Sequence, residues 1–208
     1  MPYARAGFDL EVALSQAGIE KQQSDSRLNE LYLGGRGTGT KLFWDRVPPE
    51  TLPFSPENLL IFGVGLLSGT LAPGANRTAL VTRSPQTKLL TYSTLGGFWG
   101  AELKHAGYDN LIISGRSPIP VYLWINDDKV EIRDAGHIWG QDARETQRTI
   151  REELGKDAAQ ILCIGPAGEN RVYSATIQHG LGCGASRTGV GAVMGAKNLK
   201  AIAVYGTK

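Results

Sequence analysis

The sequence predicts an α+β fold in which a unit of mixed or antiparallel strands and short helices occurs twice, related by a pseudo-two-fold axis. Three observations carry this prediction: short strand-like runs are frequent, helical windows are few, and several features recur in the same order in two parts of the chain. We expect the two copies at about residues 56–115 and 157–206, within one domain that covers residues 1–208.

The strand-like runs are short, rich in β-branched and aromatic residues, and bounded by turn residues. Between two of them, Asp127 and Asp128 predict a tight hairpin turn. The expected strands cover residues 8–14, 58–65, 78–84, 110–115, 120–127, 129–135, 159–165, 171–178 and 200–206.

Helices are expected at residues 39–47, 98–107 and 141–157. The third is the clearest, because Ala143, Thr146, Ile150 and Leu154 recur at helical spacing before Gly155, a residue that commonly ends helices. The proline-rich stretch at residues 47–59 predicts an extended connector.

Composition excludes several classes of function. The net charge of +2 gives no field for binding nucleic acid, and no apolar run is long enough to cross a membrane. No secretory signal is evident, so a cytoplasmic location is expected. Cys163 and Cys183 form neither a disulfide framework nor a metal-binding spacing, and His179 near Cys183 is weak evidence for a metal site.

The internal repeat is visible in matched features. Asn76-Arg77 matches Asn170-Arg171. Each copy is also expected to have a short helix before its closing strand, and Gly100-Ala101 in the first matches either Gly191-Ala192 or Gly195-Ala196 in the second. Glycine-rich loops at 96–100 and 184–191 then hold equivalent places. Chance similarity of short strands is the alternative, but the matched order of several features favours duplication.

The 27 glycines predict tight turns and places where the backbone approaches another group closely. The glycine loops lack the spacing of a dinucleotide fingerprint and of a phosphate-binding P-loop. Arg77 and Arg187 could offer paired donors to phosphate or to a heterocycle, although glycines also serve turns alone. Two equivalent loops suggest a ligand with two-fold character, and we expect residues 94–100 and 183–191 to face the same side.

Several segments together resemble the N-terminal domain of the aldehyde:ferredoxin oxidoreductase family, over nearly the whole chain. They are LGGRGTGTKLFWDRVPP, SPENLLIFGVGLLSGTLAP, GGFWGAELKHAGYD, KVEIRDAGHIWG, CIGPAGEN and GVGAVMGAKNLKAIAV. The resemblance implies an oxidoreductase with a tungsten, or sometimes molybdenum, bis-pyranopterin cofactor. It also implies a duplicated α+β domain on which two pterins lie, joined by magnesium at their phosphates.

The resemblance assigns cofactor contacts to Asn76, Arg77, Thr94, Gly96, Gly97, Cys183, Gly184, Ala185, Ser186 and Arg187. The backbone carbonyls of Thr94 and Gly184 would bind the magnesium ion. Two sites depart from the aldehyde-oxidising pattern: Thr94-Leu95 replaces Asn-Ser, and Cys183 replaces an arginine. Because only an arginine side chain would bind phosphate there, phosphate binding at Cys183 is in doubt.

The family's cysteine run for an iron–sulfur cluster is not present in this chain. The resemblance therefore implies that the 4Fe-4S cluster and the substrate-binding groups come from further domains or a partner subunit, with a ferredoxin-like electron carrier acting through them. Two alternatives stay open. One is the tungsten-subunit domain of an ATP-independent benzoyl-CoA reductase, and the other is a non-catalytic pterin carrier or interaction module.

Overall fold

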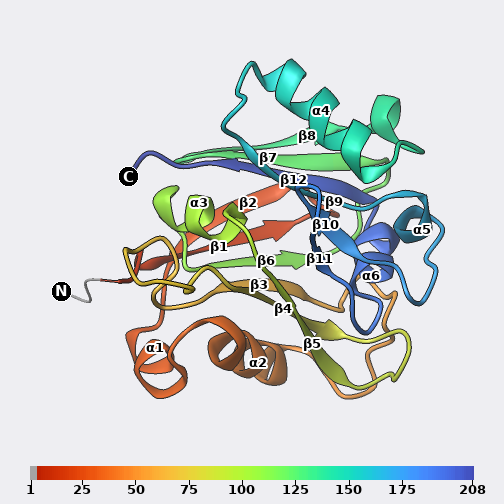
Figure 1. The fold of residues 1–208 in the computed structure, drawn as a ribbon. Helices are drawn as coiled ribbons and strands as arrows, with labels where there is room; N and C mark the ends of the chain where they lie inside the picture. Colours follow the sequence, from red (N-terminus) through yellow and green to blue (C-terminus); the bar gives the residue numbers. More distant parts are fainter. Residues whose placement is uncertain (1–3) are drawn as a thin grey trace.

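The computed structural model describes residues 4–208, which form two six-stranded sheets with six short α-helices (Figure 1). The first sheet has the strand order β2-β1-β6-β3-β4-β5 and the second has the order β11-β10-β9-β12-β7-β8. The strands of the first sheet are β1 (Phe8–Ala13), β2 (Gly18–Gln23), β3 (Leu60–Val64), β4 (Thr78–Arg83), β5 (Leu90–Leu95) and β6 (Asn110–Ser114). Those of the second are β7 (Val121–Asn126), β8 (Lys129–Asp134), β9 (Gln160–Cys163), β10 (Ile177–His179), β11 (Cys183–Ala185) and β12 (Leu199–Tyr205).

The two sheets have the same connectivity. Reading β7 to β12 in place of β1 to β6 reproduces the order of the first sheet, and in each sheet only the first and last strands of the unit pair in parallel. The duplicated α+β fold expected from the sequence is confirmed. The repeated topology also includes the hairpins β1–β2 and β7–β8, so it begins earlier in each half than the repeated sequence features do.

The helices complete a layered arrangement (Figure 1). Helix α2 packs on β3 and β4 at the outer face of the first sheet, and α4 packs on β9 at the outer face of the second. Helices α3 and α6 contribute to the central core between the sheets. The helices are α1 (Ser26–Tyr32), α2 (Gly35–Arg46), α3 (Trp99–His105), α4 (Ala143–Leu154), α5 (Pro166–Glu169) and α6 (Val190–Ala196), with a 3-10 turn at Gly136–Ile138.

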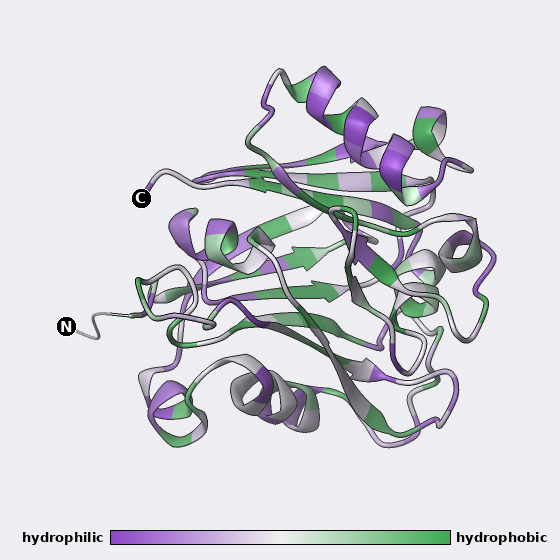
Figure 2. Cartoon of the chain, viewed as in Figure 1, coloured by the Kyte–Doolittle hydropathy of each residue, from purple (hydrophilic) through white to green (hydrophobic). Residues whose placement is uncertain are grey.

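The inner helix of each copy packs against strands of the other copy. Helix α3 of the first copy contacts β12 and β9, while α6 of the second contacts β4. The indole Nε1 of Trp99, a fully buried side chain, donates a hydrogen bond to the carbonyl oxygen of Ile202 at 3.1 Å. Because an unpaired buried donor is costly, this bond fixes α3 against the second sheet. The two sheets therefore share one central core, whose strands are predominantly hydrophobic in Figure 2.

Helix α4 begins and ends at local sequence signals, inside the expected range of residues 141–157. The carboxylate of Asp142 accepts hydrogen bonds from the backbone N–H groups of Arg144 and Glu145, which are otherwise unpaired at a helix start. Gly155 ends the helix in the left-handed conformation, with φ 58°. The hairpin turn at Asp127-Asp128 is also present, between β7 and β8.

The expected strand over residues 171–178 is wrong for most of its length. Only Ile177–His179 is a strand, and Arg171 follows α5 with φ 56°. Arg77, in contrast, directly precedes β4. Asn170-Arg171 is therefore not the structural counterpart of Asn76-Arg77. Gly100-Ala101 corresponds to Gly191-Ala192, since each pair occupies the second and third positions of its helix.

Three strands and two helices were not expected from the sequence. The strands β2, β5 and β11 lie at sheet edges, where few of their side chains are buried and the apolar signal is weak. The missed helices, α1 and α5, are only 7 and 4 residues long. No helix within residues 4–208 is long and apolar enough to cross a membrane.

Candidate functional site: the junction of two glycine loops

The glycine loops of the two copies meet. Strands β5 and β11 lie side by side, the N–H of Arg187 donates to Ser93 Oγ at 3.4 Å, and Ser84 Oγ donates to the carbonyl of Thr188 at 2.9 Å. The loops at 94–100 and 183–191 therefore adjoin on one side of the domain, as the sequence predicts. We call the region formed by Arg77, residues 94–98, His179 and residues 180–187 the loop junction.

Gly97 and His179 interlock at the centre of the junction. Gly97 has φ 91°, and a β-carbon at this position would lie 2.7 Å from Nε2 of His179. At Gly96 a β-carbon would lie 3.8 Å from both the thiol of Cys183 and the guanidinium of Arg77. A side chain at residue 97 would therefore displace the imidazole ring, so the first loop depends on glycine for both its conformation and its contact with the second copy.

His179 is held in its neutral form. Its side chain is 5% exposed, and this burial lowers its pKa. Its Nδ1 atom lies 3.1 Å from the carbonyl oxygen of Ile161. Because a carbonyl oxygen only accepts hydrogen bonds, Nδ1 carries the ring proton and Nε2 carries the lone pair.

Thr94 and Gly184 occupy equivalent places in the two copies. Each is the residue before the last in its strand, β5 or β11. Each pairs with the second residue of the preceding strand, Thr94 with Ala79 and Gly184 with Gln178. Their backbone carbonyls are therefore placed by the same local topology.

The two arginines of the junction are available to a ligand. Arg77 and Arg187 have exposed side chains, and neither guanidinium forms a hydrogen bond or an ion pair with the described residues. Arg83 shows the contrast, because its guanidinium donates to the carbonyls of Pro49 and Lys88. No acidic residue is among those that define the junction. Two unpaired guanidinium groups beside glycine backbone form a site of a kind that suits phosphate.

The other expected site residues differ in what they offer. Oδ1 of Asn76 accepts a hydrogen bond from the N–H of Gly69 at 3.1 Å, so this side chain supports a turn. Ala185 is buried in the central core, which leaves only its backbone for a ligand. Ser186 and Gly184 line a hollow of about 350 Å³ beside the hairpin β10–β11, together with Thr176, Gln178, Gly180, Leu181, Gly182 and Cys183.

His179 and Cys183 face each other across the hairpin β10–β11. No group of three or more His, Cys, Asp or Glu side chains suited to a metal ion occurs within residues 4–208, so this pair is not part of a larger ligand cluster. No role for His179 at the glycine loop was expected from the sequence. Its contact with Gly97 joins residues distant in the chain, and no local pattern encodes it.

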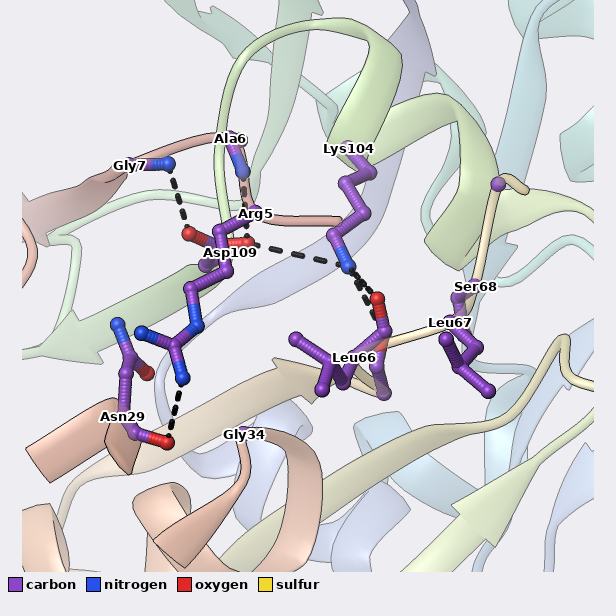
Figure 3. Close-up of polar contacts among 12 residues, drawn as sticks. Arg5, Ala6, Gly7, Asn29, Gly34, Leu66, Leu67, Ser68, Lys104 and Asp109 are labelled. Carbon is purple, nitrogen blue, oxygen red and sulfur yellow. Dashed lines mark hydrogen bonds and ion pairs between the residues drawn. The ribbon is translucent and has the colours of Figure 1, made fainter. Parts of the chain in front are cut away.

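A second polar cluster lies around Lys104 and Asp109 (Figure 3). The carboxylate of Asp109 accepts from the N–H groups of Ala6 and Gly7 at 3.0 and 2.8 Å. Nζ of Lys104 donates to the carbonyls of Gly65 and Leu66 at 3.0 and 2.6 Å, and burial lowers its pKa. These groups are occupied with each other and with backbone, so the cluster ties the N-terminal segment to the domain and presents few free donors to a ligand.

The fold and the junction together define a class of protein: a duplicated α+β domain in which two glycine loops meet beside two exposed, unpaired arginines. Within that class, the chain belongs to the family of the aldehyde ferredoxin oxidoreductase N-terminal domain, whose model matches residues 9–206. Its relatives include enzymes named as tungsten-containing.

Individual relatives agree with this assignment. The chain is 47% identical to the tungsten-containing aldehyde ferredoxin oxidoreductase of Pyrococcus furiosus, with 99% of this chain and 34% of the relative covered. It is 36% identical to the WOR-like subunit of an aliphatic sulfonate oxidoreductase from the same organism, over 99% of this chain and 35% of the relative. This chain thus spans about a third of the length of these relatives, so further domains or subunits are implied.

A solved structure gives a still higher identity. The active site complex BamBC of benzoyl coenzyme A reductase, in complex with 1,5-dienoyl-CoA, contains a chain that is 58% identical and superposes with a TM-score of 0.97. The match covers 99% of this chain and 31% of that chain.

Proposed function

We propose that the loop junction binds the phosphate end of a tungsten bis-pyranopterin cofactor and makes this chain the cofactor platform of an oxidoreductase. The observation that carries the proposal is the equivalence of Thr94 and Gly184 beside two unpaired arginines. A cofactor made of two similar pterins needs two similar contacts, and a duplicated unit supplies them. Molybdenum in place of tungsten would use the same residues.

The residues of the junction that would hold the cofactor have different roles in this proposal. Arg77 and Arg187 would neutralise phosphate charge through charge-assisted hydrogen bonds, and the carbonyls of Thr94 and Gly184 would bind the magnesium ion. Gly96 and Gly97 let the backbone approach the pterins without intervening side chains. Cys183 stands where the aldehyde-oxidising pattern has arginine, so phosphate has one cationic partner fewer on that side. When bound, the metal and its dithiolenes supply the redox chemistry.

The proposal requires groups from outside this chain. A 4Fe-4S cluster and the residues that bind the substrate would come from further domains or from a partner subunit, and electrons would pass to or from a ferredoxin-like carrier. A location in the cytoplasm, where low-potential carriers operate, accords with this role.

For the substrate we favour two candidates. An aldehyde is suggested by the relative that is 47% identical, and an aromatic CoA thioester by the solved reductase complex that is 58% identical. The higher identity favours the CoA thioester, reduced in a complex with an electron-supplying subunit. A non-catalytic pterin carrier is the remaining alternative.

The first experiment is metal and pterin analysis of the protein purified anaerobically from a host that makes the cofactor. We expect tungsten with about two pterins per chain in the wild type, and strong loss of both in the double variant Arg77→Ala, Arg187→Ala. Arg148→Ala is the matched control, since this helix-surface arginine lies outside the junction. A double variant that keeps its pterin would contradict the proposed site.

A second experiment separates the candidate activities. The cofactor-loaded protein is assayed with its copurifying partner for aldehyde oxidation and for dienoyl-CoA oxidation, both with a dye as electron acceptor. Turnover of only one of the two substrates shows whether the protein belongs with the aldehyde-oxidising or the benzoyl-CoA-reducing enzymes. A protein that holds pterin stoichiometrically but turns over neither, even with its partner, would favour the carrier.

A further inference from the structure

His179 has a nitrogen that the fold leaves unused. The imidazole belongs to β10 of the second copy, and its ring fills the space beside Gly97 of the first. Its neighbours on the inner face of the same hairpin, Ile177 and Ala185, are apolar members of the central core. An apolar ring would fill that space, and the bond from Nδ1 to the carbonyl of Ile161 uses only one of the two imidazole nitrogens.

The lone-pair nitrogen is directed toward the glycine loop. Nδ1 carries the proton, which it donates to the carbonyl of Ile161, and Nε2 has no hydrogen-bond partner among the described residues. Nε2 is also not among the buried unpaired side-chain atoms of residues 4–208, which are Nε of Arg83 and Oδ1 of Asn110. Nε2 is therefore not fully enclosed, although the residue is only 5% exposed. Because an unpaired acceptor in such a place is costly, a ligand N–H group that pairs with it would be favoured.

We infer that Nε2 of His179 accepts a hydrogen bond from an N–H group of the heterocycle that lies on Gly96-Gly97. The inference rests on the proposed function, under which this heterocycle is a pterin. A lone pair repels phosphate oxygen, so the junction would bind the anionic part and the N–H part of the ligand at different places. Anionic groups lie at Arg77 and Arg187, and an N–H donor lies at His179.

The inference makes His179 a ligand-contacting residue rather than a structural filler. The test compares His179→Phe, which keeps a flat ring but removes both the Nε2 acceptor and the Nδ1 donor to Ile161, with His179→Gln, which keeps a donor and an acceptor. Each variant is prepared in the cofactor-loaded and cofactor-free states. Two quantities are measured: the rate at which pterin is lost on anaerobic dilution, and the midpoint of thermal unfolding in both states.

We expect the Phe variant to lose pterin about fivefold faster than the wild type, the effect of one hydrogen bond, and the Gln variant to fall between them. The cofactor-free midpoint of the Phe variant should fall modestly, because the carbonyl of Ile161 loses its donor, and the cofactor-loaded midpoint should fall further. Equal pterin loss from the Phe variant and the wild type overturns the inference. Equal falls of the cofactor-free and cofactor-loaded midpoints also overturn it, because the role of His179 is then structural.

The failure of this inference is distinguishable from failure of the proposed function. A wild-type protein that holds no pterin overturns both. A wild type that holds pterin, together with a Phe variant that holds it equally well, overturns only the role of His179. If the Phe variant does not fold, the Gln variant decides, and a Gln variant that loses pterin more than tenfold faster, despite its acceptor, also overturns the inference.

Discussion

Nζ of Lys197 lies 3.0 Å from the carbonyl oxygen of Gly115, at the start of the segment that joins the two copies. It also donates to the carbonyl of Pro56 at 3.2 Å, and the residue is 2% exposed. Burial lowers the pKa of Lys197 to about 7. The end of α6 is thus bound to the connection between the copies by an amine whose protonation is disfavoured in the folded state.

This amine predicts how stability depends on pH. An unfolded lysine keeps its proton up to about pH 10, whereas folded Lys197 loses it near pH 7. The unfolded state therefore holds more protons above pH 7, and the free energy of unfolding should rise with pH. Burial raises the pKa of Cys163 to about 12, and the resulting opposite slope offsets the rise above about pH 9. The effect of Lys197 on the free energy of unfolding is therefore best measured between pH 7 and 9.

We expect the free energy of unfolding to rise by ~2 kcal/mol from pH 7 to 9, as one proton is involved. Urea denaturation at several pH values measures this rise. Lys197→Met should abolish most of it, while Lys129→Met, at an exposed lysine, should preserve it. A rise that persists in Lys197→Met would show that another group causes it.

The packing of α5 on α6 gives a second prediction. A β-carbon added at Gly195 would lie 2.6 Å from the carbonyl carbon of Gly168. Because backbone cannot yield as a flexible side chain does, Gly195→Ala should cost ~3 kcal/mol or more. Gly182→Ala, where a β-carbon would meet nothing within 4 Å, should cost less than about 0.5 kcal/mol. Urea denaturation of both variants is the measurement, and equal stabilities would contradict the close approach.

The interlock of Gly97 with His179 predicts energetic coupling between the copies. Gly97→Ala should destabilise the protein by ~3 kcal/mol, from the clash with the ring and from its positive φ. In a His179→Ala background the clash disappears and only the backbone strain of ~1 kcal/mol remains. A double-mutant cycle by urea denaturation should therefore give a coupling of ~2 kcal/mol. Additive effects would mean that the loop moves away from the ring.

These contacts show why the sequence predicted some features and not others. The boundaries of α4 follow from Asp142 and Gly155, whose effects are local. The duplication was visible because glycines recur at equivalent turns. The match of Asn170-Arg171 with Asn76-Arg77 failed because a dipeptide carries no information about its distance from the next strand. The contact of His179 with Gly97 is set by sheet packing, which periodicity does not reveal.

The equivalence of Thr94 and Gly184 gives the last prediction, which separates backbone from side-chain roles. If both residues act through their carbonyl groups, Thr94→Ala should leave pterin and tungsten content unchanged, because the exposed hydroxyl takes no part. Gly184→Ala should also be tolerated, since its β-carbon would lie 3.6 Å from the carbonyl oxygen of Ile177, an ordinary contact. Arg77→Ala, measured in parallel by metal and pterin analysis, should lose most of the cofactor because no backbone group replaces a guanidinium. Loss of cofactor in Thr94→Ala equal to that in Arg77→Ala would mean that the hydroxyl contacts the ligand, and the two copies would then bind it by different chemistry.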